Sequence, residues 1–300
     1  MAITIQSESK KIITLPEYQE YVKTNVVAKD KDSILESSSM LKALSNNKNF
    51  LAEIINSELK DLNQFQKSNL YTAQTILLGG GDDFLIRANV WLPPCKSQRL
   101  KAIEDKVYSY LLPHDHNFDF LTIGHFGPGY ETSIYEYDYA DTIGKPGEEV
   151  DLKLLEHTRL DEGKMMFYRS GKDVHTQFHP DDLSISLNLL LIPDQVTIQD
   201  QYYFDTDKKI ISGYVEANVE TRNLLLKLAG LIGNDETRNH LEFIAQKHPA
   251  RRNRIQAYDS LAKLCPDDHE QIWKRALLDN ETLVKIRAKQ EMTQLESTHA

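Results

Sequence analysis

The sequence predicts an α+β protein in three zones: a helical segment over residues 1–67, an antiparallel β domain over 68–213 and an all-α domain over 214–300. In the first and last zones apolar residues recur at spacings of three and four, which is the period of a half-buried helix. In the middle zone short apolar or alternating segments are separated by glycine, proline, asparagine and aspartate, which is typical of strands and turns. Runs of helix followed by runs of strand favour the α+β class.

The first zone is predicted to be helical between residues 16 and 67. Polar residues separate its apolar positions, which are Leu41, Leu44, Phe50, Leu51, Ile54, Ile55, Leu59 and Leu62. The run Asn46-Asn47-Lys48-Asn49 predicts a break between two helices. We expect this zone to pack on the β domain.

The middle zone holds at least five predicted strands. Gly79–Asp83 and Pro93-Pro94 bound the first of them, and Gly127-Pro128-Gly129 turns the chain after the second. We predict no helix between these strands, so an antiparallel sandwich or barrel is expected. The predicted strands cover residues 84–92, 118–123, 132–139, 164–169 and 183–191.

The third zone is helical and contains a weak internal repeat. Arg254–Ala257 and Lys285–Ala288 match in pattern 31 residues apart, and residues 267–278 form the predicted helix between them. Pro249 opens one helix and Pro266 ends it. The pattern resembles a HEAT-type helical repeat, whose stacked helix pairs make a concave surface for a protein or peptide. A protein partner, self-association through these helices, and simple capping of the β domain are all compatible with it.

Composition narrows the class of protein. Thirty-five basic and 45 acidic residues give a net charge of −10, which argues against a nucleic-acid partner, since phosphate contacts need clustered positive charge. Two distant cysteines, Cys95 and Cys265, do not form a disulfide framework. There is no apolar segment of signal-peptide or membrane-spanning type. We therefore expect a cytoplasmic protein without membrane contact.

The triplet His114-Asp115-His116 is the most informative motif. In an extended strand side chains alternate, so the two imidazoles would share one face, about 7 Å apart, while Asp115 points away. A third imidazole from a neighbouring strand would complete a three-nitrogen face for a divalent metal. The segment 171–179 offers His175 and His179. These two would lie about 13 Å apart in a strand, so only one of them is expected to be a ligand.

The β zone resembles the cupin superfamily, and within it the cysteine-dioxygenase-like thiol dioxygenases. The resemblance covers roughly residues 35 to 193 and is most specific in His114-Asp115-His116 and the downstream Gly171-Lys-Asp-Val-His175. It implies a cupin barrel, a double-stranded β-helix, in which three histidines hold iron(II). On this resemblance the ligands are His114, His116 and His175, and His179 is not one.

The chain departs from that family at three places. The glutamate that usually follows the cupin histidine pair is missing, and Asp119 comes nearest to it. Ala73 stands where thiol dioxygenases carry an arginine for the substrate carboxylate. Ser186, Asn188 and Leu190 stand where they carry Ser-x-His-x-Tyr. Free cysteine is therefore not the expected substrate. Arg87 and Arg159 are the candidates to bind an anionic group from other strands.

Three neutral imidazoles leave the charge of a divalent ion uncompensated, which favours an anionic or chelating substrate. We expect a mononuclear non-haem iron(II) oxygenase. Its substrates would be O₂ and a small molecule, or a group borne on a peptide or carrier protein. Four polar residues on predicted core strands are candidates to orient the substrate, although each can equally be an ordinary half-buried strand residue: Asn188, Tyr135, Tyr137 and Gln177.

Two other classes of function remain open on the sequence. A non-oxidative metal-dependent cupin, such as an isomerase or hydrolase, would use the same ligands, because imidazole suits several metals. In a non-catalytic binding module the histidines would be structural and the helical repeat would carry the function.

Overall fold

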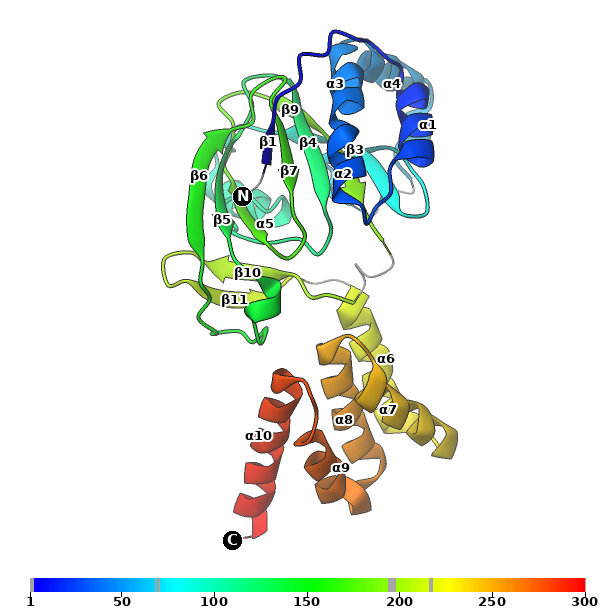
Figure 1. Cartoon of the computed structure of the whole chain (residues 1–300), viewed down its shortest axis with the longest axis vertical. Helices are drawn as coiled ribbons and strands as arrows, with labels where there is room; N and C mark the ends of the chain where they lie inside the picture. Colours follow the sequence, from blue (N-terminus) through cyan, green and yellow to red (C-terminus); the bar gives the residue numbers. More distant parts are fainter. Residues whose placement is uncertain (1–2, 68, 70, 194–197, 216–217, 300) are drawn as a thin grey trace. The chain divides into compact units, whose positions relative to one another are not determined.

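The computed structural model describes residues 3–67, 69, 71–193, 198–215 and 218–299. The chain forms two compact units. The first contains Met1–Tyr139, Val150–Val196 and Tyr203–Lys209, and the second contains Ala140–Glu149, Thr197–Tyr202 and Ile210–Ala300. Within the described residues, no helix has both the length and the apolar character required to cross a bilayer. The predicted α+β class with antiparallel sheets is confirmed (Figure 1).

The N-terminal zone of the first unit folds into four helices and a 3₁₀ turn. A capping box between Thr14 and Glu17 starts the first helix, where Pro16 occupies an early position that needs no N–H donor. The predicted break is confirmed, because one helix ends at Asn46 and the next begins at Phe50. The elements are α1 (Leu15–Asn25), α2 (Lys31–Glu36), α3 (Ser38–Asn46), α4 (Phe50–Glu58) and η1 (Leu59–Gln64).

Two antiparallel sheets form the β part of the first unit. The larger has the order β1-β7-β4-β9-β3-β2 and the smaller β6-β5-β8. The five predicted strands correspond to β3, β4, β5, β7 and β9, whereas β1, β2, β6 and β8 were not among them. The bounds are β1 (Ile3–Ile5), β2 (Thr75–Gly80), β3 (Phe84–Trp91), β4 (Phe120–Phe126), β5 (Glu131–Glu136), β6 (Lys153–Arg159), β7 (Met165–Tyr168), β8 (Asp173–Gln177) and β9 (Ser184–Leu191).

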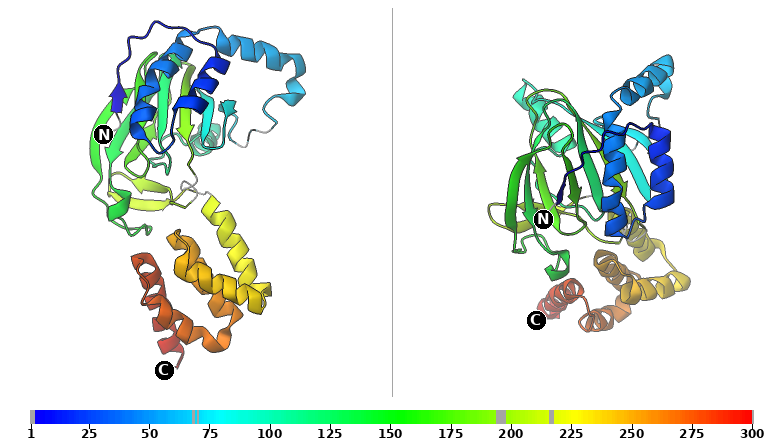
Figure 2. Two further views of the ribbon diagram at one scale, coloured as in Figure 1. Left: turned by 45° about the vertical axis from the view of Figure 1, so that its right-hand side comes forward. Right: turned by 45° about the horizontal axis from the view of Figure 1, so that its top comes forward.

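Side chains on the two faces of the large sheet belong to two different hydrophobic cores. Its outer face packs on the N-terminal helices, with Leu187 and Leu189 of β9 and Leu121 of β4 beside residues of α1 and α3. Figure 2 shows these helices gathered on one side of the sheet. Its inner face carries Leu190 and Phe120, which pack with Ile134 of the small sheet. Because strand side chains alternate, the polar residues between the outward leucines also face inward.

One expectation for the middle zone is wrong. Helix α5 (Gln98–Val107) lies between β3 and β4, where no helix was predicted. Its apolar residues Leu100, Ile103 and Val107 do have helical spacing, but each is about half exposed and the helix buries no residue. A helix without a buried face gives only a weak periodic signal within a zone of strands.

The second unit is mainly helical, as predicted for the last zone. One helix ends at Leu264 shortly before Pro266, and the predicted helix over 267–278 appears as α9. Its core includes Leu241, Ala257, Trp273 and Val284, which come from four helices. The elements are the short strand β11 (Ile210–Tyr214) and the helices α6 (Asn218–Ile232), α7 (Asp235–Lys247), α8 (Arg251–Leu264), α9 (His269–Ala276) and α10 (Thr282–His299). The short strand β10 (Tyr202–Asp205) belongs to the first unit apart from Tyr202.

Candidate metal centre

The His114-Asp115-His116 triplet alternates as expected, although it is not a regular strand. Only His114 makes a β-bridge, to His175 of β8 and to Tyr203 of β10. The preceding Pro113 has no N–H to donate, which limits regular pairing. His114 and His116 line one pocket. Asp115 is fully buried and accepts a 2.5 Å hydrogen bond from the Tyr137 hydroxyl.

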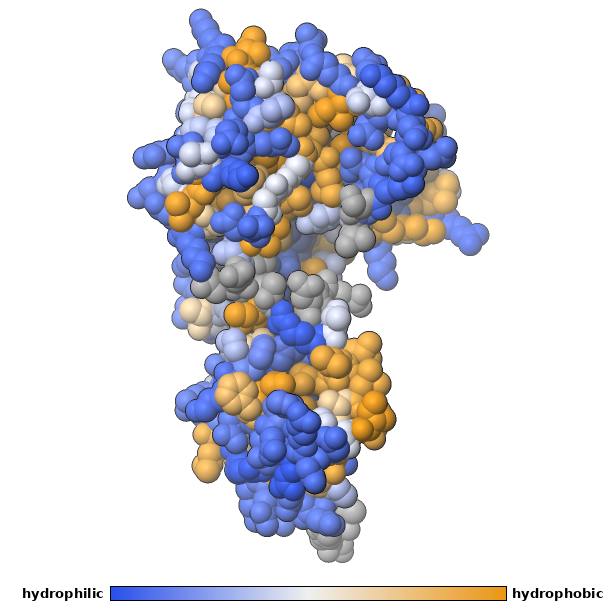
Figure 3. All heavy atoms as spheres, turned by 90° about the vertical axis from the view of Figure 1, so that its right-hand side faces the viewer, coloured by the Kyte–Doolittle hydropathy of each residue, from blue (hydrophilic) through white to orange (hydrophobic). Residues whose placement is uncertain are grey.

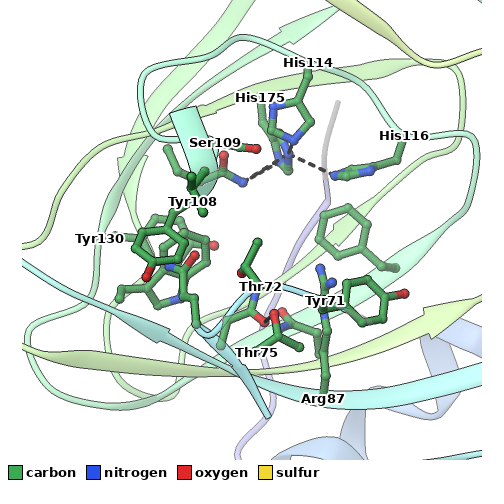
Figure 4. Close-up of a pocket in the computed structure, with 17 residues that line it drawn as sticks. Tyr71, Thr72, Thr75, Arg87, Tyr108, Ser109, His114, His116, Tyr130 and His175 are labelled. Atoms are coloured by element: carbon green, nitrogen blue, oxygen red, sulfur yellow. Dashed lines mark hydrogen bonds between the residues drawn. The ribbon is translucent and has the colours of Figure 1, made fainter. Parts of the chain in front are cut away.

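The three predicted ligands converge on one point (Figure 4). His175 Nε2 lies 3.2 Å from His114 Nε2 and 3.2 Å from His116 Nε2. Candidate ligand atoms of the three side chains all lie within 4.8 Å of one another. Two nitrogens that bind one ion at about 2.1 Å, at angles between tetrahedral and octahedral, stand roughly 3.0–3.4 Å apart. The spacing of the nitrogens therefore suits a metal ion.

The surroundings keep these imidazoles in the form that binds metal. His114 Nδ1 lies 2.8 Å from the Leu112 carbonyl, which only accepts, so the ring proton is on Nδ1 and Nε2 is left with a lone pair. Burial lowers the pKa of His114, and the charge of Arg87 lowers it further. Burial holds the pKa of His175 well below its ordinary value, and the neighbouring His114 and His116 add to this effect. Neutral imidazole is the ligating form.

The other two sequence candidates for a ligand lie elsewhere. His179 Nε2 is 2.5 Å from Asp105 Oδ1, its Nδ1 is 3.0 Å from the Leu92 carbonyl, and its ring stacks on Tyr110. It links α5 to the β domain and is outside the convergent group. Asp119 accepts a 2.6 Å hydrogen bond from the Ser170 N–H, and burial raises its pKa. It does not take the place of the missing glutamate.

A pocket of about 190 Å³ opens beside the three histidines. Arg87 of β3 and Asn188 of β9 are register partners in the sheet, and both side chains line it. Arg87 Nε and Asn188 Nδ2 are shielded from solvent, and neither has a hydrogen-bond partner among the described residues. The guanidinium lies 5.1 Å from the ring centre of Tyr71. Burial lowers the pKa of Arg87, partly offset by the phenols of Tyr71 and Tyr130. Two side chains that line the pocket therefore each carry a shielded donor with no partner among the described residues.

The remaining predicted site residues are divided between the pocket and other places. Gln177 lines the pocket, with its Nε2 3.1 Å from His175 Nε2. Tyr137 is linked to the site through its hydrogen bond to Asp115. Tyr135 is half-buried on β5 and is not among the pocket residues. Arg159 is paired with Glu131 at 2.9 Å and Asp181 at 3.5 Å, also outside the pocket.

Several pocket residues were missed. Asn89 and Trp91 line the pocket beside Arg87, and all three occupy alternate positions of β3. The alternation of one strand was a signal that could have found them. Tyr130 packs on Trp91 with ring centres 4.1 Å apart. Thr75 of β2 donates a 3.1 Å hydrogen bond to the Asn89 side chain. No local pattern marks Thr75 or Tyr130.

Comparison with known proteins adds little. No protein-family model and no curated protein matches the chain. Among solved structures, a hydroquinone 1,2-dioxygenase from Sphingomonas sp. TTNP3 with 4-hydroxybenzoate bound is 10% identical; the match covers 41% of this chain and 68% of that one, with a TM-score of 0.26. A sugar phosphate isomerase of the cupin superfamily from Silicibacter pomeroyi DSS-3 is 14% identical. The match covers 49% of this chain and 82% of that one, with a TM-score of 0.27. A structure of DMSP lyases is 11% identical over 39% of this chain, with a TM-score of 0.23, and the match spans 46% of that lyase chain. Likeness at these TM-scores does not assign a function to the chain.

Proposed function

We propose that this chain is a cupin-type mononuclear non-haem iron(II) oxygenase. His114, His116 and His175 are its ligands, and its substrate is a small anionic or chelating molecule. The observation that carries the proposal is the convergence of three Nε2 atoms, with separations of 3.2 Å from His175 to each of the other two. Three neutral nitrogens without a carboxylate suit iron among several divalent metals. When bound, iron(II) supplies the redox chemistry of dioxygen.

The pocket residues support an anionic substrate. Arg87 Nε and Asn188 Nδ2 are shielded donors for which the described part of the chain supplies no acceptor, and an unmet donor in a site costs free energy until a ligand supplies the acceptor. A carboxylate or enolate held there would be oriented on one side by β3 and β9 and on the other by the histidines. The volume of about 190 Å³ is below that of drug-sized sites, so it suits a small molecule or the end group of a larger one.

The aromatic residues around the pocket have a separate role. Trp91, Tyr130 and Phe120 line it and belong to one buried cluster. They exclude water from the space between Arg87 and the histidines, which strengthens the interaction of an anion with the guanidinium. Gln177 is positioned to hydrogen-bond a group bound beside His175.

The first test is metal content after anaerobic purification, measured for the wild type, His116→Ala and the control His179→Ala. We expect about one iron per chain in the wild type, as a mononuclear site requires. His116→Ala should lose it, and His179→Ala should keep it, because His179 bonds Asp105 and Leu92 instead. Oxygen uptake with a panel of small carboxylates and enols then tests the reaction.

Each outcome bears on the proposal. One zinc or nickel per chain, lost in His116→Ala, would support the ligand set and contradict the oxygenase in favour of a non-oxidative metal-dependent enzyme. If the purified protein holds no metal and takes up none on reconstitution, both the ligand set and the oxygenase proposal are overturned. A non-catalytic binding module would then remain. Iron that persists in His116→Ala would overturn the ligand assignment.

A further inference from the structure

Helix α6 is apolar on two opposite faces. One face is buried: Val219 and Leu226 are 3% and 7% exposed, and Gly230 lies so close to α8 that an added Cβ would be 2.8 Å from Ser260 Cα. The opposite face is exposed. Its five aliphatic side chains are exposed by 46% to 82% and define the α6 stripe: Leu224, Leu225, Leu228, Leu231 and Ile232. An orange area on the helical part of the chain in Figure 3 shows hydrophobic residues gathered at the surface.

The α6 stripe is a single surface. At 100° per residue its five positions fall within an arc of about 120°. Within this arc the described part of α6 holds one polar side chain, Thr221. The five side chains expose roughly 600 Å², which is at the upper end of the largest apolar patch on a typical monomer. It also approaches the roughly 800 Å² that each partner contributes to a stable interface. A helix that is apolar on both faces is expected to be covered on both.

The order of the α6 stripe indicates what covers it. Its members stand at −4, −3, 0, +3 and +4 relative to Leu228, so the stripe reads the same in both directions along the helix. Two copies of α6 packed antiparallel about a two-fold axis at Leu228 would place Leu224 against Leu231 of the other copy. Leu225 would meet Ile232 of the other copy, and Leu228 would meet Leu228 of the other copy. A two-fold interface requires this self-complementarity, and spacings of three and four are those of packed helix pairs.

We propose that the chain forms a homodimer through the α6 stripe, with the two α6 helices antiparallel and Leu228 at the two-fold axis. The dimer joins two helical units through α6 alone. This inference does not depend on the proposed function, because no residue of the α6 stripe lines the candidate metal centre.

The first measurement is the mass of the full chain by sedimentation equilibrium over a hundredfold concentration range. The wild type should have twice the 34.5 kDa of one chain. Leu228→Asp should have the mass of one chain, because a carboxylate meeting its own copy in an apolar contact is strongly unfavourable. The control Leu278→Asp changes a side chain that is 84% exposed and outside α6, and should remain dimeric. Circular dichroism and metal content check that each variant is folded.

Cysteine cross-linking tests the two-fold geometry. In a background with Cys95→Ser and Cys265→Ala, Leu228→Cys should form an intermolecular disulfide in most chains on mild oxidation. Ile232→Cys is the matched control. In the proposed dimer the residues 232 of the two copies lie on opposite sides of the two-fold axis, eight helical positions or about 12 Å apart along the helix axis. This exceeds the roughly 7 Å between Cα atoms that a disulfide spans.

Three results would overturn the proposal. A monomeric wild type is the first, and if Leu228→Asp then lowers the melting temperature, another part of the same chain covers the stripe. A dimer that survives Leu228→Asp is the second, because the contact would lie elsewhere. The third is a dimer that cross-links through residue 232 and not through residue 228.

Discussion

At the scale of single residues, we propose that Arg87 binds substrate rather than stabilises the fold. Its Nε is shielded and has no partner among the described residues, while its guanidinium lies over Tyr71. Arg169, in contrast, donates to Asp173 at 2.6 Å and to Glu136 at 2.7 Å. A charge without an acceptor costs folding free energy, whereas a paired one stabilises a buried carboxylate.

We predict that Arg87→Met leaves the free energy of unfolding unchanged or raises it by about 1 kcal/mol, because an apolar side chain of similar length removes the unmet donor. The matched variant Arg169→Met should lower the free energy of unfolding by roughly 3 kcal/mol, since the buried Asp173 carboxylate is left without its cation. Urea unfolding of the metal-loaded proteins measures both. If Arg87→Met lowered the free energy of unfolding by more than about 2 kcal/mol, Arg87 would be a residue that stabilises the fold.

The hydrogen bond from Tyr137 to Asp115 is predicted to position the metal ligands. Asp115 lies between His114 and His116 and is fully buried, so its 2.5 Å bond fixes the backbone that carries both. Tyr137→Phe should weaken metal affinity by about 10–100-fold, the usual effect of losing an outer partner of a metal site. Competition with a chelator measures this affinity. Tyr135→Phe is the control, and an equal loss in both variants would contradict the role.

At the scale of elements, His125 joins β4 to the N-terminal helices. Its ring is 3% exposed, its Nδ1 lies 3.2 Å from the Ser45 hydroxyl of α3, and it contacts the ring of Phe50 in α4. Burial, together with the charge of the nearby Lys48, lowers its pKa from the ordinary 6.5 to about 4. The neutral ring is therefore part of the contact between the helices and the sheet.

This contact should weaken in acid. The folded pKa is below the unfolded value, so the stabilisation is fully present above about pH 6.5 and is lost as the pH falls toward 4. Between pH 7 and pH 4.5 the wild type should lose about 2 kcal/mol of unfolding free energy more than His125→Gln does. Urea unfolding at the two pH values tests this difference. His157→Gln, at a side chain 51% exposed, should behave as the wild type.

At the scale of the whole molecule, the division into two units predicts how metal affects unfolding. The pocket and its three histidines belong entirely to the first unit. A ligand stabilises only the unit that binds it, by about 2.7 kcal/mol at a free concentration of 100 times Kd. For a unit of this size, that raises the melting temperature by roughly 5–10 °C.

Differential scanning calorimetry should therefore show two transitions, of which iron(II) raises only one. His116→Ala should abolish the shift and leave the second transition unchanged. A single transition that shifts as a whole would show instead that the two units unfold together.

Much of the fold could be predicted because its signals are local. Apolar residues at spacings of three and four predict helices, and Asn46–Asn49 predicted the break between α3 and α4. Strands such as β3 and β9 lie between glycine or proline and carry β-forming residues. Helix α5 was missed because its apolar residues are exposed, so the pattern lacked a buried face.

The sequence by itself determined the chemistry of the candidate centre: two histidines on one side of a short extended segment, a third downstream and no following glutamate. Only the tertiary structure decided that Arg87 and Asn188 share the pocket, because they are joined by the pairing of β3 with β9 across a hundred residues of chain. It also decided that Tyr137 bonds Asp115 and that His179 bonds Asp105. The physical reason is that periodicity reports the face of each element, whereas the partner across that face depends on register and packing between distant segments.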